Sequence, residues 1–321
     1  MIRVSVGCDE ARGMGDIPYY FETEPLPVMA FTPDAEYPIF NREKGLLHMD
    51  ASLKGLGADC PVRSIEGGLA PNVVPDKCVA VIKKGAVSLS HLKETVKTYA
   101  SDRILIEETE NGDIQVTSTG VTAHASRAQL GFNACMNLVK FLCLVLGENA
   151  PAALKYANAC VGLGTDGEGF GIKSQDDSGA LTINIGIFRA DETGGLMTID
   201  IRYPVSEDGE KIIETIRKKS QKYGCDATVD MHKVPLNIPE SAPLIQKLSK
   251  AYERATGKTA EVKAQGGATY ARTLENRGVA FGAAFEDGKS GGVHEANECI
   301  VIDELMRHCE ICVEAMKELM D

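Results

Sequence analysis

Residues 196–232, LMTIDIRYPVSEDGEKIIETIRKKSQKYGCDATVDMH, hold the pattern from which the fold of the chain can be predicted. Apolar and polar residues alternate over 196–203 and again over 227–232, which predicts two strands. Between them, apolar residues recur every three or four positions over 209–223, which predicts an amphipathic helix. This order of strand, helix and strand indicates an α+β unit in which the helix covers one face of a sheet.

A second unit of the same kind precedes this stretch. The sequence predicts a strand over 78–82, a helix over 92–99 and a longer helix over 128–146. Between the two helices, Asn111-Gly112 favours the tight turn of a β-hairpin, because both residues tolerate a positive φ. We therefore expect two similar small α+β units in tandem in the middle of the chain.

The two ends of the chain show alternating strands and helices. The predicted elements are strands over 2–6, 27–31, 261–264 and 279–283 and helices over 242–255 and 302–320. The simplest arrangement is one α/β domain, formed by residues 1–42 and 237–321, with residues 43–236 inserted as a lid.

Charge and composition exclude several classes of function. The 321 residues carry 34 Lys and Arg against 46 Asp and Glu, a formal net charge of −12, so we expect neither nucleic acid nor an anionic membrane as partner. No apolar run reaches the roughly 20 residues that cross a bilayer, and we expect a cytoplasmic protein. The ten cysteines lie mostly in apolar patterns, which favours reduced, buried thiols. Cys309 and Cys312 lack a second pair, which favours packing over metal binding.

Three residues at the ends of the chain have settings that favour chemistry. Glu10 follows the predicted strand 2–6, at the edge where open α/β sheets place their sites. Asp34 ends a buried strand between two prolines and is a candidate oxygen ligand for a divalent metal. His294 projects from a loop of small residues. For Glu10 a solvated turn residue, and for Asp34 a capping or turn residue, are the alternatives.

Further candidates lie in the lid and in a glycine-rich turn. His124 lies between a strand and a helix, where it can reach a substrate carbonyl or simply mark the helix entry. Arg202 closes the strand 196–203, where its paired N–H groups suit a carboxylate, with an ordinary ion pair as the alternative. The turn at Gly266-Gly267 exposes successive backbone N–H groups that suit a carboxylate or an oxyanion, and it lacks the spacing of a nucleotide-binding loop. We expect His308 at the surface and assign no role to His48, His91 and His232.

Taken together and in this order, these segments resemble the zinc-dependent dipeptidases of the PepV and carnosinase type. These belong to a larger group that includes aminoacylase and succinyl-diaminopimelate desuccinylase. The resemblance spans nearly the whole chain, and the strings PDAEYP and GGxTYAR are similar to the PepV-like branch in particular. The segments that carry it are 6–10, 32–38, 67–68, 72–76, 120–126, 201–204, 266–272 and 294–298.

The resemblance implies a fold, an activity and a set of roles. The fold is a zinc-peptidase-like α/β sheet domain with an inserted α+β lid of two ferredoxin-like halves. The activity is hydrolysis of dipeptides at a site with two zinc ions. Glu10 is then the general base, and His124 stabilises the tetrahedral intermediate. Asp34 and His294 are metal ligands, one for each ion. The implied substrate-binding residues are Asn72, Arg202, Gly266 and Gly267.

The chain departs from the family pattern at two places. Ala11 stands where family members carry a second Glu as a metal ligand, and the first histidine ligand and the bridging aspartate have no counterpart in the sequence. Because a zinc ion takes three or four protein donors, we expect weak or no activity from this chain alone and a complementing N-terminal polypeptide as a partner. The alternatives are a non-catalytic relative that binds peptides or amino acids, and an N-acyl-amino-acid deacylase.

Overall fold

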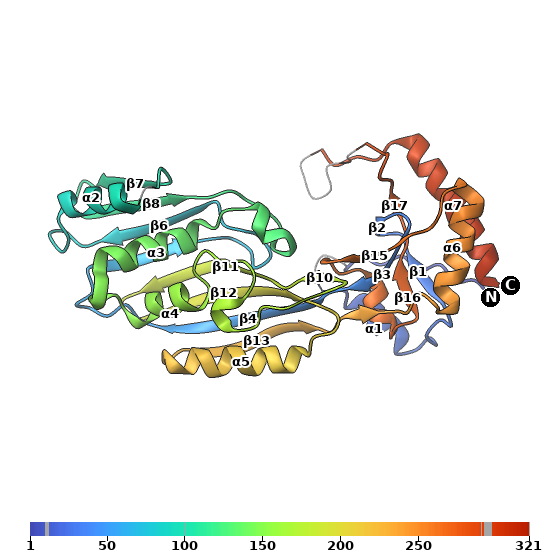
Figure 1. Ribbon diagram of the computed structural model, residues 1–321, viewed down its shortest axis with the longest axis horizontal. Helices are drawn as coiled ribbons and strands as arrows, with labels where there is room; N and C mark the ends of the chain where they lie inside the picture. Colours follow the sequence, from blue (N-terminus) through green and yellow to red (C-terminus); the bar gives the residue numbers. More distant parts are fainter. Residues whose placement is uncertain (10–12, 100, 290, 292–296, 321) are drawn as a thin grey trace. The chain divides into compact units, whose positions relative to one another are not determined.

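The computed structural model describes residues 1–9, 13–99, 101–289, 291 and 297–320. It divides the chain into two compact units, Met1–Lys44 with Pro235–Asp321 and Gly45–Val234, which we call unit 1 and unit 2. The divisions fall close to the boundaries expected after residues 42 and 236. Figure 1 shows the elements of both units, coloured along the chain.

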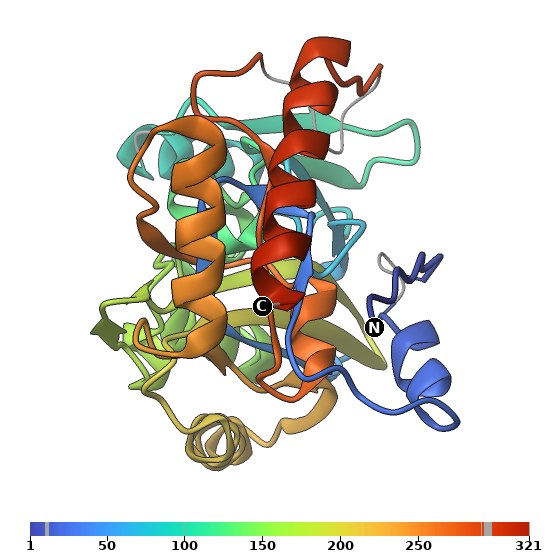
Figure 2. The same ribbon diagram turned by 90° about the vertical axis from the view of Figure 1, so that its right-hand side faces the viewer.

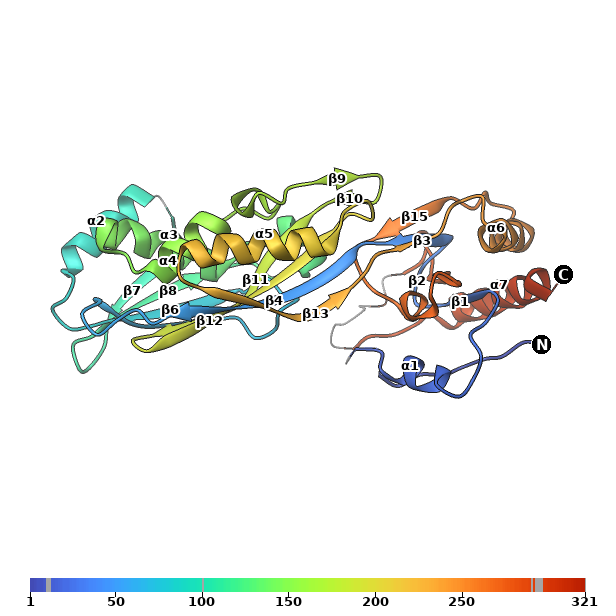
Figure 3. The same cartoon turned by 90° about the horizontal axis from the view of Figure 1, so that it is seen from below.

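Unit 2 is built on one eight-stranded antiparallel sheet with the strand order β13-β4-β12-β11-β5-β6-β8-β7. The strands are β4 (Gly45–Lys54), β5 (Val62–Gly67), β6 (Lys77–Ile82), β7 (Ile104–Glu108), β8 (Ile114–Thr119), β11 (Thr182–Asp191), β12 (Gly194–Tyr203) and β13 (Asp226–Lys233). The helices are α2 (Leu89–Tyr99), α3 (Ala134–Leu146), α4 (Ala152–Cys160) and α5 (Gly209–Lys222). Figure 3 shows these four helices on the same face of the sheet. Short elements complete the unit: the 3₁₀ turns η2 (Ala125–Leu130), η3 (Gly147–Asn149) and η4 (Glu168–Phe170), and the hairpin of β9 (Gln175–Asp176) and β10 (Gly179–Ala180).

The sheet of unit 2 consists of two ferredoxin-like halves. In one half, β4, α4, β11, β12, α5 and β13 follow each other as βαββαβ, and the four strands lie in the order 4-1-3-2. The other half, from β5 to α3, has the same arrangement with its strands permuted along the chain, and it is inserted between β4 and α4. The expected lid of two ferredoxin-like halves is therefore confirmed, with β11 joined to β5 so that the halves share one sheet. The expected tandem order is wrong, because one half is inserted within the other along the chain.

The core of unit 2 follows the alternation of its strands. Met49, Ile183 and Ile199 are at most 1% exposed and lie in one apolar cluster with residues of all four helices. The expected single helix over 128–146 is wrong: η2 ends before Gly131, and α3 begins at Ala134. The Asn133 side chain accepts a hydrogen bond from the Met136 N–H and caps a new helix there.

Unit 1 has a smaller mixed sheet in the order β1-β16-β3-β14, and β15 pairs in parallel with β3. A separate pair is formed by β2 and β17. The strands are β1 (Ala30–Thr32), β2 (Ala35–Glu36), β3 (Ile39–Glu43), β14 (Leu236–Asn237), β15 (Val262–Gln265), β16 (Gly278–Ala280) and β17 (Ala283–Ala284). The helices are α1 (Asp16–Phe21), α6 (Pro243–Thr256), the 3₁₀ turn η5 (Tyr270–Leu274) and α7 (Ile302–Met320). Figure 2 shows α6 and α7 side by side. The strand expected over 279–283 is interrupted, since β16 ends at Ala280 and β17 begins at Ala283.

Two other expectations for unit 1 are wrong. Residues 2–6 form no strand, and the side chains of Ile2, Val4 and Val6 are 45%, 78% and 95% exposed, because no described strand pairs with them. His308 is not a surface residue: it is 9% exposed, and its Nδ1 lies 2.8 Å from the hydroxyl of the buried Tyr37. Burial lowers the pKa of His308, which favours the neutral ring in this hydrogen bond with Tyr37.

Among the described residues, no helix combines the length and the apolar character that crossing a membrane requires.

Candidate functional site

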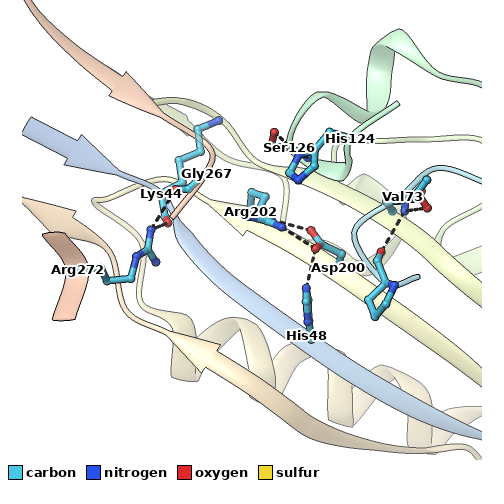
Figure 4. A network of polar contacts seen from close by, with 11 residues as sticks. Lys44, His48, Val73, His124, Ser126, Asp200, Arg202, Gly267 and Arg272 are labelled. Atoms are coloured by element: carbon cyan, nitrogen blue, oxygen red, sulfur yellow. Dashed lines mark hydrogen bonds and ion pairs between the residues drawn. The ribbon is translucent and has the colours of Figure 1, made fainter. Parts of the chain in front are cut away.

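Arg202 lies in a buried group of charged side chains on the sheet of unit 2. Its Nε and Nη2 donate to the two carboxylate oxygens of Asp200 at 2.8 and 2.9 Å. His48, directly opposite Asp200 on β4, places Nε2 2.7 Å from Asp200 Oδ2 (Figure 4). Asp200 is 0% exposed. Burial acts to raise the pKa of Asp200, but the hydrogen bond from His48 and the charge of Arg202 outweigh it, and the pKa is lowered.

The position of Asp200 on β12 explains why it can hold the Arg202 guanidinium through two hydrogen bonds. Residues 200 and 202 lie on the same face of β12 because alternate residues of a strand do, and the short spacing allows both hydrogen bonds. The ion pair that the sequence left as an alternative is therefore present. It also fixes the plane of a guanidinium that carries five N–H donors, so Asp200 and His48 determine the direction in which Arg202 presents its charge.

Asn72 and His124 lie on two neighbouring backbone segments of unit 2. The Ala125 N–H donates to Asn72 O at 2.9 Å, and Val73 forms a β-bridge with His124. The exposed His124 caps η2, with Nδ1 accepting from the Ser126 N–H at 3.2 Å and lying 2.7 Å from the Ser126 hydroxyl (Figure 4). Because Nδ1 is an acceptor, the neutral ring carries its proton on Nε2. The helix-entry position expected as one alternative is thus observed, and it also fixes the tautomer.

Asn184 connects these segments to the strands that carry Arg202. Its Nδ2 donates to Val73 O at 3.0 Å, and on β11 it lies opposite Asp200. Unit 2 therefore brings Asn72, His124 and Arg202 into one polar region, although they are far apart in the sequence.

The Gly266-Gly267 turn of unit 1 is held by a buried carboxylate that the sequence analysis missed. Glu43, at the end of β3, is 0% exposed and accepts from Thr269 Oγ1 at 2.6 Å, Gln265 Nε2 at 2.9 Å and Arg272 Nε at 3.1 Å. Arg272 also donates through Nη2 to Lys44 O at 2.7 Å and to Gly267 O at 3.4 Å (Figure 4). Both ends of the turn are thus tied to β3.

The turn presents fewer backbone N–H groups than the sequence suggested. The Thr269 N–H donates to Glu43 Oε2 at 3.3 Å, so it is used inside unit 1. At Gly267, a Cβ would meet no atom within 4 Å. The backbone at Gly267 therefore borders open space, as a turn that binds a ligand through its N–H groups requires.

Asp34 is exposed and lies between β1 and β2. Its neighbour Ala35 donates its N–H to Gly282 O at 2.6 Å, which fixes the backbone after Asp34 to the segment before β17. Glu10 and His294 lie outside the described residues. Among the residues that the structure describes, no group of three or more His, Cys, Asp or Glu side chains could hold a metal ion. The described donors therefore do not form a complete metal site.

Asp16 is a further polar residue that the sequence did not reveal. Its Oδ2 accepts from the Cys8 N–H at 2.7 Å and from the Tyr270 hydroxyl at 2.9 Å, and the Asp9 N–H donates to it at 3.2 Å. Burial acts to raise the pKa of Asp16, but these hydrogen bonds outweigh it and the pKa is lowered. The described residues before Glu10 are thereby tied to η5, which follows the Gly266-Gly267 turn.

Weak signals for these residues exist in the sequence. Asp200 is spaced two residues from Arg202 in a strand, a spacing that puts both on one face. Glu43 ends the strand Ile39–Glu43, which begins with the apolar pair Ile39 and Phe40, and a buried acidic side chain there needs a partner. Neither signal names the partner, because His48 and Arg272 are distant in the sequence.

The chain is similar in sequence to proteins of a known family. The family model described as Peptidase family M20/M25/M40 matches residues 28–318. "Putative dipeptidase YtjP" of Bacillus subtilis is 33% identical over 329 residues, covering 99% of this chain and 69% of that protein. "Putative dipeptidase SH1171" of Staphylococcus haemolyticus is 32% identical over 330 residues, again covering 69% of its length. The crystal structure of aminopeptidase PepT from Bacillus cereus has a TM-score of 0.44 at 13% identity, covering 92% of this chain and 58% of that one.

Proposed function

Because the chain belongs to peptidase family M20/M25/M40, we propose that it carries part of the machinery of a metal-dependent dipeptidase. The observation that carries the proposal is the match over 99% of the chain to relatives whose names read "Putative dipeptidase". Two features support the proposal. Arg202 in unit 2 offers N–H donors that suit a peptide carboxylate, and the Gly266-Gly267 turn of unit 1, held by Glu43, offers backbone N–H groups. We place the activity in the cytoplasm, in keeping with ten free cysteines, of which five are buried and three exposed.

Two zinc ions are the proposed cofactor, and when bound they polarise the scissile carbonyl and lower the pKa of water. Asp34 and His294 would each hold one ion. Each ion would then have one protein donor from this chain, whereas a zinc ion takes three or four. We therefore propose that further donors come from a polypeptide outside these 321 residues.

Each remaining residue has one proposed task in peptide hydrolysis. Glu10 takes a proton from the attacking water and passes it to the leaving amine. His124, with its proton on Nε2, donates a hydrogen bond to the oxyanion of the tetrahedral intermediate. Arg202, oriented by Asp200, and Asn72 are the proposed substrate-binding side chains of unit 2, and the backbone of Gly266 and Gly267 is the proposed substrate-binding segment of unit 1.

A dipeptide hydrolysis assay with added zinc or manganese tests the proposal. The chain is assayed alone and together with the part of the Bacillus subtilis relative that lies outside the match. We expect hydrolysis in the mixture and little or none by the chain alone. Glu10→Gln should abolish it, whereas the matched control Glu36→Gln, at an exposed glutamate, should not.

Other results of the same assay would support the alternatives. Dipeptide binding without hydrolysis, both by the chain alone and by the mixture, would indicate a non-catalytic relative. Faster cleavage of an N-acetylated amino acid than of a dipeptide would indicate a deacylase. Full dipeptidase activity of the chain alone would contradict the proposed need for outside donors.

A further inference from the structure

Two cysteine thiols meet in the core of unit 2, where α3 packs on β6 (Figure 1). Cys78 lies on β6 and Cys135 in the first turn of α3, and both are 0% exposed. A Cβ added to Gly67, the residue opposite Cys78 on β5, would lie 2.6 Å from the sulfur of Cys135 and 2.7 Å from that of Cys78. The two sulfurs are therefore at most 5.3 Å apart, which is the sum of these two distances.

The two thiols also interact directly. A hydrogen bond with Cys135, together with burial, raises the pKa of the Cys78 thiol well above its ordinary value. Cys78 is thus a neutral thiol in the folded chain. Because the thiolate is the form that attacks an oxidant, the closed pair reacts slowly, and its oxidation requires the first turn of α3 to open. The proposed dipeptidase mechanism uses neither cysteine.

The start of α3 is connected to the polar region of unit 2. Asn133, the cap of α3, lies two residues before Cys135, and its Nδ2 donates to Asn184 Oδ1 at 3.0 Å and to Ile185 O at 2.9 Å. Asn184 in turn holds Val73 O. A covalent bond at Cys135 would therefore restrain the helix start from which these contacts are made.

We propose that Cys78 and Cys135 are a redox-sensitive pair: a peroxide converts them to a reversible disulfide that ties the first turn of α3 to β6. Disulfides of cytosolic proteins are usually transient and redox-sensing, which agrees with two thiols that are free in the reduced chain. The inference goes beyond the proposed function and does not depend on it.

The chemistry has two steps. When α3 opens, the Cys135 thiolate attacks one oxygen of hydrogen peroxide, the O–O bond breaks, and the departing hydroxide takes up a proton as water, which leaves a sulfenic acid. The sulfur of Cys78 then attacks the sulfenic sulfur. The S–S bond forms, the S–O bond breaks, and the hydroxide leaves as water with the thiol proton of Cys78. Two thiols are thereby oxidised to one disulfide, and one peroxide is reduced to two waters.

The disulfide is expected to stabilise unit 2. It closes the loop between residues 78 and 135, which restricts the unfolded chain more than the folded one. The urea concentration at the unfolding midpoint of unit 2 should therefore rise on oxidation and return to its starting value with dithiothreitol. The Met136 N–H, which Asn133 caps, should exchange more slowly in the oxidised chain.

The test is peptide mapping of the full 321-residue chain after treatment with hydrogen peroxide in native buffer. Remaining thiols are blocked with iodoacetamide, and the digest is analysed by mass spectrometry without reductant. We expect a peptide pair that joins Cys78 to Cys135 and that dithiothreitol separates. It should form at least about tenfold more slowly than the exposed Cys309 is oxidised, because burial protects the pair.

Two variants and a matched control complete the experiment. Cys78→Ala and Cys135→Ala should lose both the linked peptides and the rise of the urea midpoint. The control is Cys143→Ala, about two turns further along α3, which should behave like the unaltered chain. Each variant is compared with its own reduced form, so a loss of stability from the substitution itself does not affect the comparison.

Three results would overturn the inference. The first is complete oxidation of Cys309 in the native chain without linked Cys78 and Cys135 peptides. The second is a linked pair whose urea midpoint equals that of the reduced chain, since the bond would then not lock α3. The third is an equal rise of the midpoint in Cys135→Ala and in the unaltered chain, which would assign the effect to other cysteines.

Discussion

Unit 2 and unit 1 differ in how they are stabilised. In unit 2, long paired strands and four helices bury one large apolar cluster, and Met49, Ile199 and Phe141 are fully buried within it. In unit 1, the strands are short, the cluster is smaller, and apolar side chains of α7 such as Met306 remain exposed. Buried polar contacts, such as those of Glu43 and His308, are expected to contribute a larger part of the stability of unit 1. The comparison teaches that buried polar contacts accompany a large apolar core in unit 2 and a smaller one in unit 1.

The largest loss of stability is expected from removing one buried carboxylate in each unit. Glu43→Ala leaves Arg272 buried without its carboxylate, and Asp200→Ala does the same to Arg202; each change should cost about 3–5 kcal/mol. Because unit 1 has the smaller core, we expect Glu43→Ala to unfold it, while Asp200→Ala weakens unit 2 without unfolding it. Hydrogen exchange measures this, through amide protection in β3 and β15 for unit 1 and in β4 and β12 for unit 2.

Two controls sharpen this prediction. Glu43→Gln keeps an acceptor for Thr269 and Arg272, so its loss of protection should be smaller than that of Glu43→Ala. If both alanine variants lower protection equally in both units, the units do not differ in the way described.

The next effect concerns backbone strain in unit 2. Gly68 has φ +81°, and a Cβ there would come within 1.9 Å of Gly186 O. Gly68→Ala should therefore destabilise unit 2 by more than the roughly 1–2 kcal/mol of a left-handed alanine alone. The control is Gly57→Ala, with φ +88° and no atom within 4 Å of the Cβ, which isolates the backbone part. Urea unfolding measures the free energy of unfolding of both variants. If both lose the same amount, the contact between the new Cβ at residue 68 and Gly186 O is relieved without a loss of stability.

The sequence predicts unit 2 better than unit 1, and the reason is physical. In unit 2, long alternating strands, amphipathic helices and the Asn111-Gly112 turn are local signals, and each agrees with the final fold. The prediction of unit 2 is incomplete, because β4, β5, β11 and α4 have no counterpart among the expected elements, and the single helix expected over 128–146 is wrong. Asn133 is a better cap than a helix interior residue, and hydrophobic periodicity alone does not detect that.

The failures in unit 1 involve partners that are distant in the sequence. Alternation over 2–6 predicts a strand, but a strand forms only where another strand pairs with it. For α7, the helical pattern over 302–320 does not show which face is buried, and the expectation that His308 lies at the surface is wrong. In the candidate site, the positions of Asn72, His124 and Arg202 in one region depend on Asn184 and Asp200, which no local pattern connects to them.

A smaller effect is expected from the pH dependence of unit 1. Burial lowers the pKa of His308, so the folded chain takes up this proton less readily than the unfolded chain, whose histidine has a pKa near 6.5. The stabilising contribution of neutral His308 is therefore complete above about pH 6.5 and is lost as the pH falls below it. Protection of α7 and β17 amides should fall between pH 7 and pH 5.5, while that of unit 2 strands changes less.

The variant His308→Gln separates this effect from other titrations. Glutamine can still form a hydrogen bond with Tyr37 but does not titrate, so the fall in α7 protection should largely disappear. The same fall in His308→Gln and in the unaltered chain would assign it to another group.

The smallest effect on stability, and the most informative for function, is expected at Gly267. In contrast to Gly68, an added Cβ meets no atom within 4 Å, so Gly267→Ala should change the free energy of unfolding by less than about 0.5 kcal/mol. The methyl group would nevertheless narrow the approach to the backbone N–H groups of the turn, so dipeptide affinity should fall in the active mixture, seen as a higher KM. The control Gly164→Ala in unit 2, with ordinary contacts at 3.4 Å, should leave both quantities unchanged. An unaltered KM in Gly267→Ala would remove this turn from the substrate site, and a large loss of stability would show that the turn is a structural element like Gly68 rather than a binding surface.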